Sequence, residues 1–249
     1  MSDGLFKMTI GDLIDDWARK QPDRDCLIYH DRGLRYSYKE FKEECDQVAR
    51  AYMALGLNKG DHIAIWATNY PEWVISQFAT PKMGGPLITV NPAYKIYELE
   101  YLLRQSDSTT LVLMQGQREV DYIKILYELC PELNTCKPGE LKSARLPYLK
   151  NVIFLGDTQY PGIFTWKEFR KLGDKIPDAA LVERQQSVGL DDVASLMYTS
   201  GTTGFPKGVM LTNLNLVADA YYIAECMKLT PEDRMCIPVP FFHCFGSVL

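Results

Sequence analysis

Short apolar runs alternate with amphipathic stretches along most of the chain, a pattern typical of an α/β fold. The apolar runs have the length of buried strands and lie at 62–66, 87–90, 110–114 and 151–155. Helix-like stretches lie between them, at 69–78, 97–105 and 120–129. This alternation predicts a mostly parallel sheet that is flanked by helices.

Capping signals predict where three further helices begin. A small polar residue is followed three positions later by an acidic residue at Thr9-x-x-Asp12, Ser37-x-x-Glu40 and Thr165-x-x-Glu168. The helix that begins after Ser37 is expected to run to about Leu55. The runs at 26–29 and 34–37 flank a turn and predict a hairpin.

The C-terminal third of the chain has its own pattern of strands and turns. Proline, glycine and polar residues over 131–150 predict a long connection. A strand over 193–198 leads directly into a glycine-rich loop, and a second strand over 208–211 follows that loop. A helix then begins at Asn213, and a further strand is expected over 235–239.

Composition excludes several classes of protein. The chain has 249 residues, of which 47% are hydrophobic and 24% charged, as in ordinary globular proteins with a sizeable core. A net charge of −5 argues against nucleic-acid binding. Seven scattered cysteines without a CxxC pair favour reduced thiols and a cytoplasmic location. No apolar run has the length of a signal peptide core or a transmembrane segment.

The glycine-rich loop at 199–208 has the chemistry of a polyphosphate site. It contains three threonines, a serine, three glycines and Lys207. Glycine lets backbone N–H groups turn toward an anion, hydroxyls add neutral donors, and the lysine adds a compact positive charge. The alternative is a Gly/Ser/Thr surface loop without function. The loop is not a Walker motif, because Pro206 stands where that pattern needs its second glycine.

A second constellation lies about thirty residues later, at 238–246. Two prolines fix the backbone, three phenylalanines supply apolar surface, and His243 can titrate near neutral pH. Such a segment can line an apolar pocket that has one polar tip. The alternative is a buried aromatic strand end with a hydrogen-bonded core histidine. Cys244 and His243 are sequence neighbours, which argues against a Cys/His nucleophile pair.

Both stretches resemble the motifs of the adenylate-forming enzymes, which include acyl-CoA synthetases, peptide-synthetase adenylation domains and luciferases. The stretch Tyr198–Val209 matches the phosphate loop of that family without interruption. The stretch Pro240–Val248 resembles the aromatic-histidine motif of fatty acyl-CoA synthetases, especially the medium-chain type. The segment Val90–Tyr94 also resembles the family and is assigned a structural role.

The resemblance implies a role for each matching residue. Lys207 and His243 would be catalytic, and Thr199 would help to hold Mg²⁺. Phe242, His243 and Phe245 would border the acyl pocket. The ATP phosphates would be bound by Thr199, Ser200, Gly201, Thr202, Thr203, Gly204, Phe205, Pro206 and Lys207.

The resemblance also implies a reaction and a domain organisation. A fatty acid would react with ATP to give acyl-AMP and pyrophosphate, and coenzyme A would then accept the acyl group. The chain would be an incomplete N-terminal AMP-binding domain, with sub-regions 1–150 and 151–249 and without the C-terminal domain. The family's adenine and ribose motifs are missing, so this piece alone is expected to be inactive, and its apolar end favours self-association into a homo-oligomer.

Two alternatives remain open at this point. The acid could be an aryl or amino acid, with a carrier protein as the acceptor. The chain could also be a noncatalytic nucleotide-binding module, which would bind ATP tightly without any effect of a carboxylate.

Overall fold

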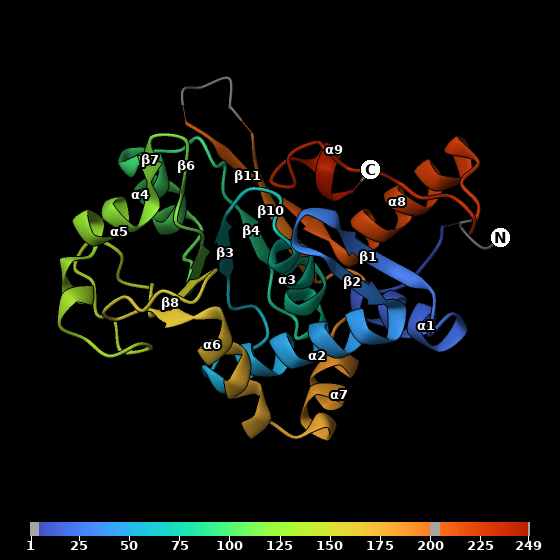
Figure 1. The fold of residues 1–249 in the computed structure, drawn as a ribbon, viewed down its shortest axis with the longest axis horizontal. Coiled ribbons are helices and arrows are strands. Elements are labelled where there is room, and N and C mark those ends of the chain that lie inside the picture. The colour runs from blue at the N-terminus through green and yellow to red at the C-terminus, as the bar shows by residue number, and fades with distance from the viewer. Residues whose placement is uncertain (1–4, 200–204, 249) are drawn as a thin grey trace.

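A seven-stranded sheet forms the centre of the computed structural model, which describes residues 5–199 and 205–248 (Figure 1). Its strands run in the order β11-β10-β4-β3-β5-β8-β9. All neighbouring pairs are parallel except β10 and β11. The strands are β3 (Ile63–Trp66), β4 (Leu87–Thr89), β5 (Thr110–Leu113), β8 (Asn151–Phe154), β9 (Phe164–Thr165), β10 (Val193–Thr199) and β11 (Lys207–Thr212). The predicted mostly parallel sheet flanked by helices is confirmed.

Helices cover both faces of the sheet because of the order in which the strands are connected. The chain passes from β3 to β4 in one direction and then from β4 back across β3 to β5. Right-handed crossovers therefore place α3 and α4 on opposite faces. The helices are α1 (Ile10–Lys20), α2 (Tyr38–Ala54), α3 (Pro71–Lys82), α4 (Ile96–Gln105), α5 (Tyr122–Leu129), α6 (Trp166–Leu172), α7 (Asp178–Gln186), α8 (Asn213–Met227) and α9 (Cys244–Ser247).

Small elements complete the fold. The strands β1 (Asp25–Tyr29) and β2 (Leu34–Ser37) form the expected antiparallel hairpin, with the 3₁₀ turn η1 (His30–Arg32) between them. The short strands β6 (Gly116–Gln117) and β7 (Val120–Asp121) form a second hairpin directly after β5. Two more 3₁₀ turns are η2 (Pro131–Asn134) and η3 (Gly173–Lys175).

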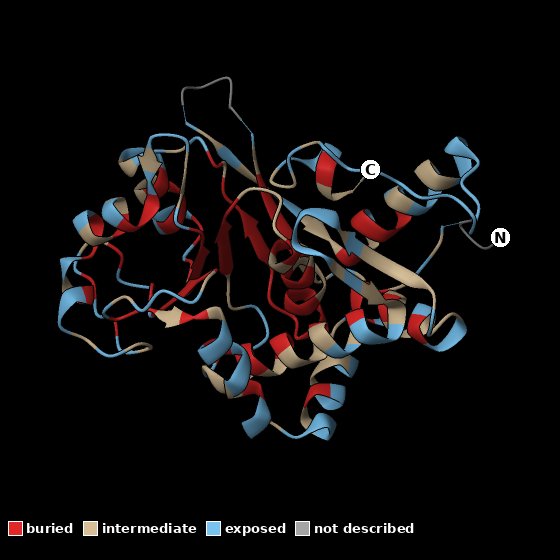
Figure 2. Cartoon of the chain, in the orientation of Figure 1, coloured by how far each residue is buried: buried red, intermediate tan, exposed pale blue. Residues whose placement is uncertain are grey.

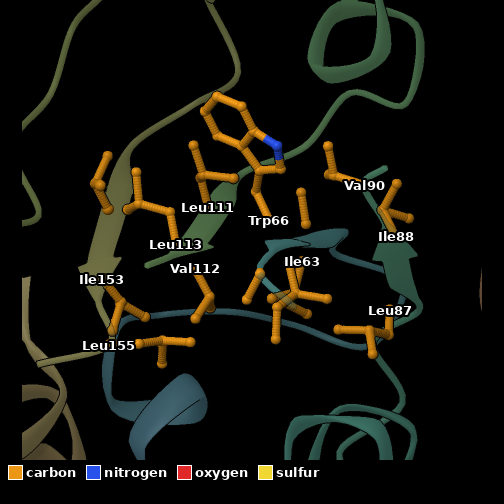
Figure 3. Packing of buried hydrophobic residues seen from close by; sticks show 14 of the residues in the cluster. Ile63, Trp66, Leu87, Ile88, Val90, Leu111, Val112, Leu113, Ile153 and Leu155 are labelled. Atoms are coloured by element: carbon orange, nitrogen blue, oxygen red, sulfur yellow. The ribbon is translucent and has the colours of Figure 1, made fainter. Parts of the chain in front are cut away.

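The core lies between the central strands and the helices on both faces, and Figure 2 shows these strands as buried along their length. β3, β4, β5 and β8 are buried at every position, which is why their sequences are continuous apolar runs. Figure 3 shows how Trp66, Leu111 and Ile88 from neighbouring strands fill this layer. The Trp66 ring stacks on Tyr122 of α5 at 3.6 Å.

A buried ion-pair cluster joins α1, α2 and α3. The ammonium group of Lys82, which is only 2% exposed, lies 2.5 Å from a carboxylate oxygen of Asp15 and 2.5 Å from one of Asp46. Because two carboxylates face one buried ammonium, the desolvation cost of the lysine is offset. The cluster therefore fixes how the three helices pack.

One predicted strand is absent from the described chain, and one predicted helix begins two residues later than expected. The strand expected over 235–239 is irregular chain, and Met235 and Ile237 are 45% and 39% exposed. Its apolar pattern is that of a strand, but no described strand lies beside it to supply hydrogen-bond partners. The helix expected from residue 120 begins at Tyr122, because Val120 and Asp121 pair with β6 instead.

Candidate functional site

The two flanks of the glycine-rich loop form an antiparallel hairpin at the edge of the sheet. β10 is buried from Ala194 to Met197, and its last residue, Thr199, is exposed. Thr199 pairs directly with Lys207, the first residue of β11. The structure therefore confirms that the loop connects two strands, and it places the Thr199 and Lys207 side chains at the mouth of one hairpin. The predicted phosphate-binding residues Ser200, Gly201, Thr202, Thr203 and Gly204 lie outside the described residues.

Lys207 is available to bind a ligand. Its side chain is exposed, and within residues 5–199 and 205–248 neither an ion pair nor a hydrogen bond engages its ammonium group. By contrast, Lys82 and Lys59 are held by carboxylates. An ammonium group that no described residue engages, beside a hydroxyl, suits an anion better than it suits a cation.

Helix α4 braces the hairpin below the loop. The Tyr101 hydroxyl donates a hydrogen bond to the Pro206 carbonyl at 3.2 Å, and its ring lies 5.4 Å from the ring of Phe205. The Tyr198 hydroxyl donates to the Gln105 side chain. Burial raises the pKa of Tyr198 to about 12, so this hydroxyl stays protonated at neutral pH. Phe205 and Pro206, predicted as phosphate-binding residues, thus contact α4.

The segment 238–248 crosses the carboxyl edge of the sheet and ends in the short helix α9, which lies beside the β10–β11 hairpin (Figure 1). Val248 packs against the apolar cluster that includes Met197 of β10. The two predicted constellations are therefore neighbours in space. His243 and Phe245 are exposed, so the alternative of a buried core histidine is wrong.

A cavity of about 640 Å³ lies under this segment. Its walls come from the chain that follows β3, β4 and β5, and from the prolines and phenylalanines of the segment. In a sheet with this connectivity, the carboxyl ends of β3 and β5 form the point at which the strand order reverses, which is the usual ligand position of open α/β sheets. Phe242 lines this cavity, whereas His243 and Phe245 are not among the residues that line it.

Three cavity residues were not predicted as site residues. Asn69 follows β3, Asn91 follows β4, and Arg118 lies in the turn between β6 and β7. Arg118 has a left-handed backbone (φ 54°) and is the one charged residue that lines the cavity within the described chain. Their common signal is position, since Asn69 and Asn91 closely follow strands of the parallel sheet and Arg118 lies in the hairpin that follows β5. Asn91 belongs to the segment that was assigned only a structural role.

The donor set fits a polyphosphate better than it fits a resident metal ion. Thr199 and Lys207 offer one hydroxyl and one ammonium group. Across the described parts of the chain, no cluster of three or more His, Cys, Asp or Glu residues could hold a metal ion. A Mg²⁺ ion at Thr199 would therefore take its other ligands from phosphate and water.

The chain belongs to the AMP-binding enzyme family, whose profile matches residues 14–249. It is 51% identical over 245 residues to a Bacillus subtilis (strain 168) protein that carries the name acyl-CoA synthetase YngI. It is 37% identical over 246 residues to the mitochondrial medium-chain acyl-CoA ligase ACSF2 of Danio rerio. These matches cover 98% of this chain, but only 45% and 40% of those relatives.

A solved structure agrees with the fold. The crystal structure of the anthranilate CoA ligase AuaEII in complex with anthranoyl-AMP superimposes with a TM-score of 0.76 at 23% identity. The match covers 99% of this chain and 43% of that one. Among the described residues, no helix is both long and apolar enough to cross a membrane.

Proposed function

We propose that this chain is the ATP-phosphate-binding part of an AMP-forming acyl-CoA ligase. The observation that carries the proposal is the hairpin that presents Thr199 beside Lys207, whose ammonium group no described residue engages. The family match and the relatives named acyl-CoA synthetase and acyl-CoA ligase support it.

The reaction has two steps. A carboxylate oxygen attacks the α-phosphorus of ATP, the bond from that phosphorus to the bridging oxygen breaks, and pyrophosphate leaves. The thiol of coenzyme A then attacks the acyl carbonyl, loses its proton, and displaces AMP. Such transfers depend on positioning and on neutralising negative charge.

Each candidate residue has a place in this scheme. Thr199, residues 200–206 and Lys207 hold the β- and γ-phosphates, and Lys207 offsets the charge that accumulates on pyrophosphate. His243 orients the carboxylate, and Phe242 and Phe245 border the acyl chain. Mg²⁺, held at Thr199, would supply further charge neutralisation on the phosphates.

The proposed substrate is a fatty acid, because the ACSF2 relatives are medium-chain ligases. An aryl or amino acid is the second candidate, and the fold shared with an anthranilate CoA ligase is compatible with it. A cytoplasmic location agrees with the free thiols of all seven cysteines, whereas the ACSF2 relatives are named as mitochondrial proteins. The division into sub-regions 1–150 and 151–249 stays a prediction, as does homo-oligomer formation.

Carboxylate-dependent ATP–pyrophosphate exchange tests the proposal. In a longer ligase that contains this chain, Lys207→Ala should slow exchange by about 100-fold, as expected for a lost charge that acts on the transition state. Its effect on fatty acid binding should be small. Lys142→Ala, at an exposed lysine away from the hairpin, is the matched control. The 249-residue chain alone should show no exchange.

Three outcomes would contradict parts of the proposal. Unchanged kinetics in Lys207→Ala would remove Lys207 from the mechanism. Strong exchange by the 249-residue chain would show that this piece is sufficient. Tight ATP binding by the chain, with no carboxylate-dependent exchange in the longer protein, would favour a noncatalytic nucleotide-binding module.

A further inference from the structure

One side chain, that of Asn69, holds the segment that carries His243. Its Nδ2 donates a hydrogen bond to the Val239 carbonyl at 2.8 Å, and its Oδ1 accepts one from the Phe241 N–H at 3.0 Å. The Asn69 amide thus bonds to the backbone as a neighbouring strand would. It supplies the only partners that the described chain gives to these two backbone groups, since no strand lies beside them.

Helix α3 makes two more contacts with the segment 238–248. The Trp73 ring lies 5.3 Å from the ring of Phe241, and the Gln77 side chain donates to the Ser247 carbonyl at 2.6 Å. Positions 69, 73 and 77 are four residues apart, which places 73 and 77 on one helix face. The segment is therefore fixed at both ends, on either side of His243.

The backbone at Asn69 is itself held by the β1–β2 hairpin. The Tyr29 hydroxyl of β1 donates to the Asn69 carbonyl. Arg32 bonds to the Glu72 carboxylate at 3.1 Å and lies over the Tyr70 ring at 4.4 Å. These contacts anchor the β3–α3 loop to the β1–β2 hairpin, and they hold the Asn69 amide in place.

The hydrogen bond to the His243 ring determines which ring nitrogen carries the proton. The ring Nδ1 accepts a hydrogen bond from the Phe245 backbone N–H at 3.4 Å and lies 3.6 Å from the Cys244 Sγ, and the His243 backbone N–H donates to the Pro240 carbonyl at 3.3 Å. When Nδ1 is an acceptor, the proton of the neutral imidazole lies on Nε2. Nε2–H is then a donor that suits a carboxylate oxygen.

We propose that Asn69 is a positioning residue for the ligase reaction: it fixes the backbone before His243 so that the neutral imidazole presents Nε2–H to the carboxylate substrate. This inference rests on the proposed function for its catalytic consequence. The physical part of it, the Asn69 clamp on residues 239–241, is a property of this chain alone.

Amide hydrogen exchange and histidine ring ¹⁵N spectra of the 249-residue chain test the clamp. Asn69→Ala should speed exchange at the Phe241 amide by about tenfold, because that N–H loses its acceptor. The His243 ring signals should shift away from the pure Nε2–H form. Asn69→Asp keeps an acceptor for Phe241 and should leave its exchange near the wild-type rate. Asn134→Ala is the control, because the Asn134 side chain donates to the nearby Pro131 carbonyl and makes no other hydrogen bond within the described residues.

Kinetics of the longer ligase test the positioning role. Asn69→Ala should lower kcat of carboxylate-dependent exchange by about tenfold and leave the KM for ATP nearly unchanged. Unchanged Phe241 exchange in Asn69→Ala would overturn the clamp. Faster Phe241 exchange with unchanged kcat would overturn the positioning role. If the wild-type ligase shows no exchange activity, the proposed function fails, and the amide exchange and ring spectra still decide whether Asn69 orients His243.

Discussion

At the residue scale, the absence of a side chain at Gly246 allows the tight turn that carries His243. Gly246 is buried in α9 against the backbone of the preceding turn. A Cβ added there would lie 2.3 Å from the Pro240 carbonyl oxygen and 2.7 Å from its carbon. Both neighbours are backbone atoms that cannot rotate away. The turn over 240–246 therefore requires glycine at this position.

Gly246→Ala should open that turn. The expected cost is about 1–3 kcal/mol, as for other overpacked sites, and it should fall mainly on residues 238–248. Limited proteolysis with chymotrypsin should then cut faster within this segment than in the wild type. Gly189→Ala is the matched control, because its nearest neighbour, Asp192 Oδ2, lies 3.8 Å from the added Cβ. Equal cleavage of the two variants would contradict the steric argument.

Some residues of the candidate site have a signal in the sequence and others have none. Thr199 and Lys207 belong to one short stretch whose composition already indicates an anion site. Asn69 gives no such signal, because its partners lie 170 and 172 residues further along the chain. Only the folded sheet brings these residues together. The same holds for Tyr101, which braces the loop flank from α4.

At the element scale, helices with local start signals were predicted well. The capping boxes at Ser37 and Thr165 are both present, with the N-cap side chain and the acidic side chain each bonded to the other's backbone. Helix α7 was missed because it is largely polar and buries only Leu181. The strand predicted over 235–239 was wrong because a strand needs a partner, which an apolar pattern cannot supply.

An ion pair between two elements should make stability depend on pH. Arg145, in the connection after η2, bonds to the Glu100 carboxylate of α4 at 3.0 Å. Hydrogen bonds from Arg145 hold the pKa of Glu100 below its ordinary 4.5. Because this pKa is lowered in the folded state, the stabilisation is complete above about pH 4.5 and is lost as the pH falls through the folded value.

Glu100→Gln should therefore lower the free energy of unfolding by a constant amount between about pH 6 and pH 8. The difference from the wild type should shrink as the pH falls below about 4.5 and vanish below the folded pKa of Glu100, where both proteins lack the charge. Urea unfolding across this range measures it. Glu119→Gln, at an exposed carboxylate, is the control. A difference that stays the same down to about pH 3 would show that the pair contributes through packing and not through charge.

At the scale of the whole molecule, the central strands are buried, whereas much of the chain from α8 onward is exposed to solvent. Figure 2 shows buried strands at the centre and exposed positions over the outer half of α8 and the chain after it. The cysteines report this difference. Cys45 and Cys130 are buried, whereas Cys226, Cys236 and Cys244 are exposed.

Alkylation with iodoacetamide should follow the same division. Burial raises the pKa of the Cys130 thiol to about 11 and that of Cys45 well above its ordinary range. Since the thiolate is the reactive form, both should react at least about 100-fold more slowly than Cys226, Cys236 and Cys244. Mass spectrometry of a time course measures each site. Equal rates at Cys45 and Cys244 in the folded protein would contradict this.

The position of β10 determines the order in which the molecule can be assembled. β10 pairs with β4, and the Ser195 hydroxyl bonds to the Leu87 carbonyl 108 residues earlier. The start of α8 also reaches back, since the Asn213 side chain accepts from the Ile10 N–H. On the ribosome, the inner strands β3, β4, β5 and β8 can pair before β10 and β11 have been translated. The hairpin that carries Thr199 and Lys207 therefore joins this sheet after the inner strands.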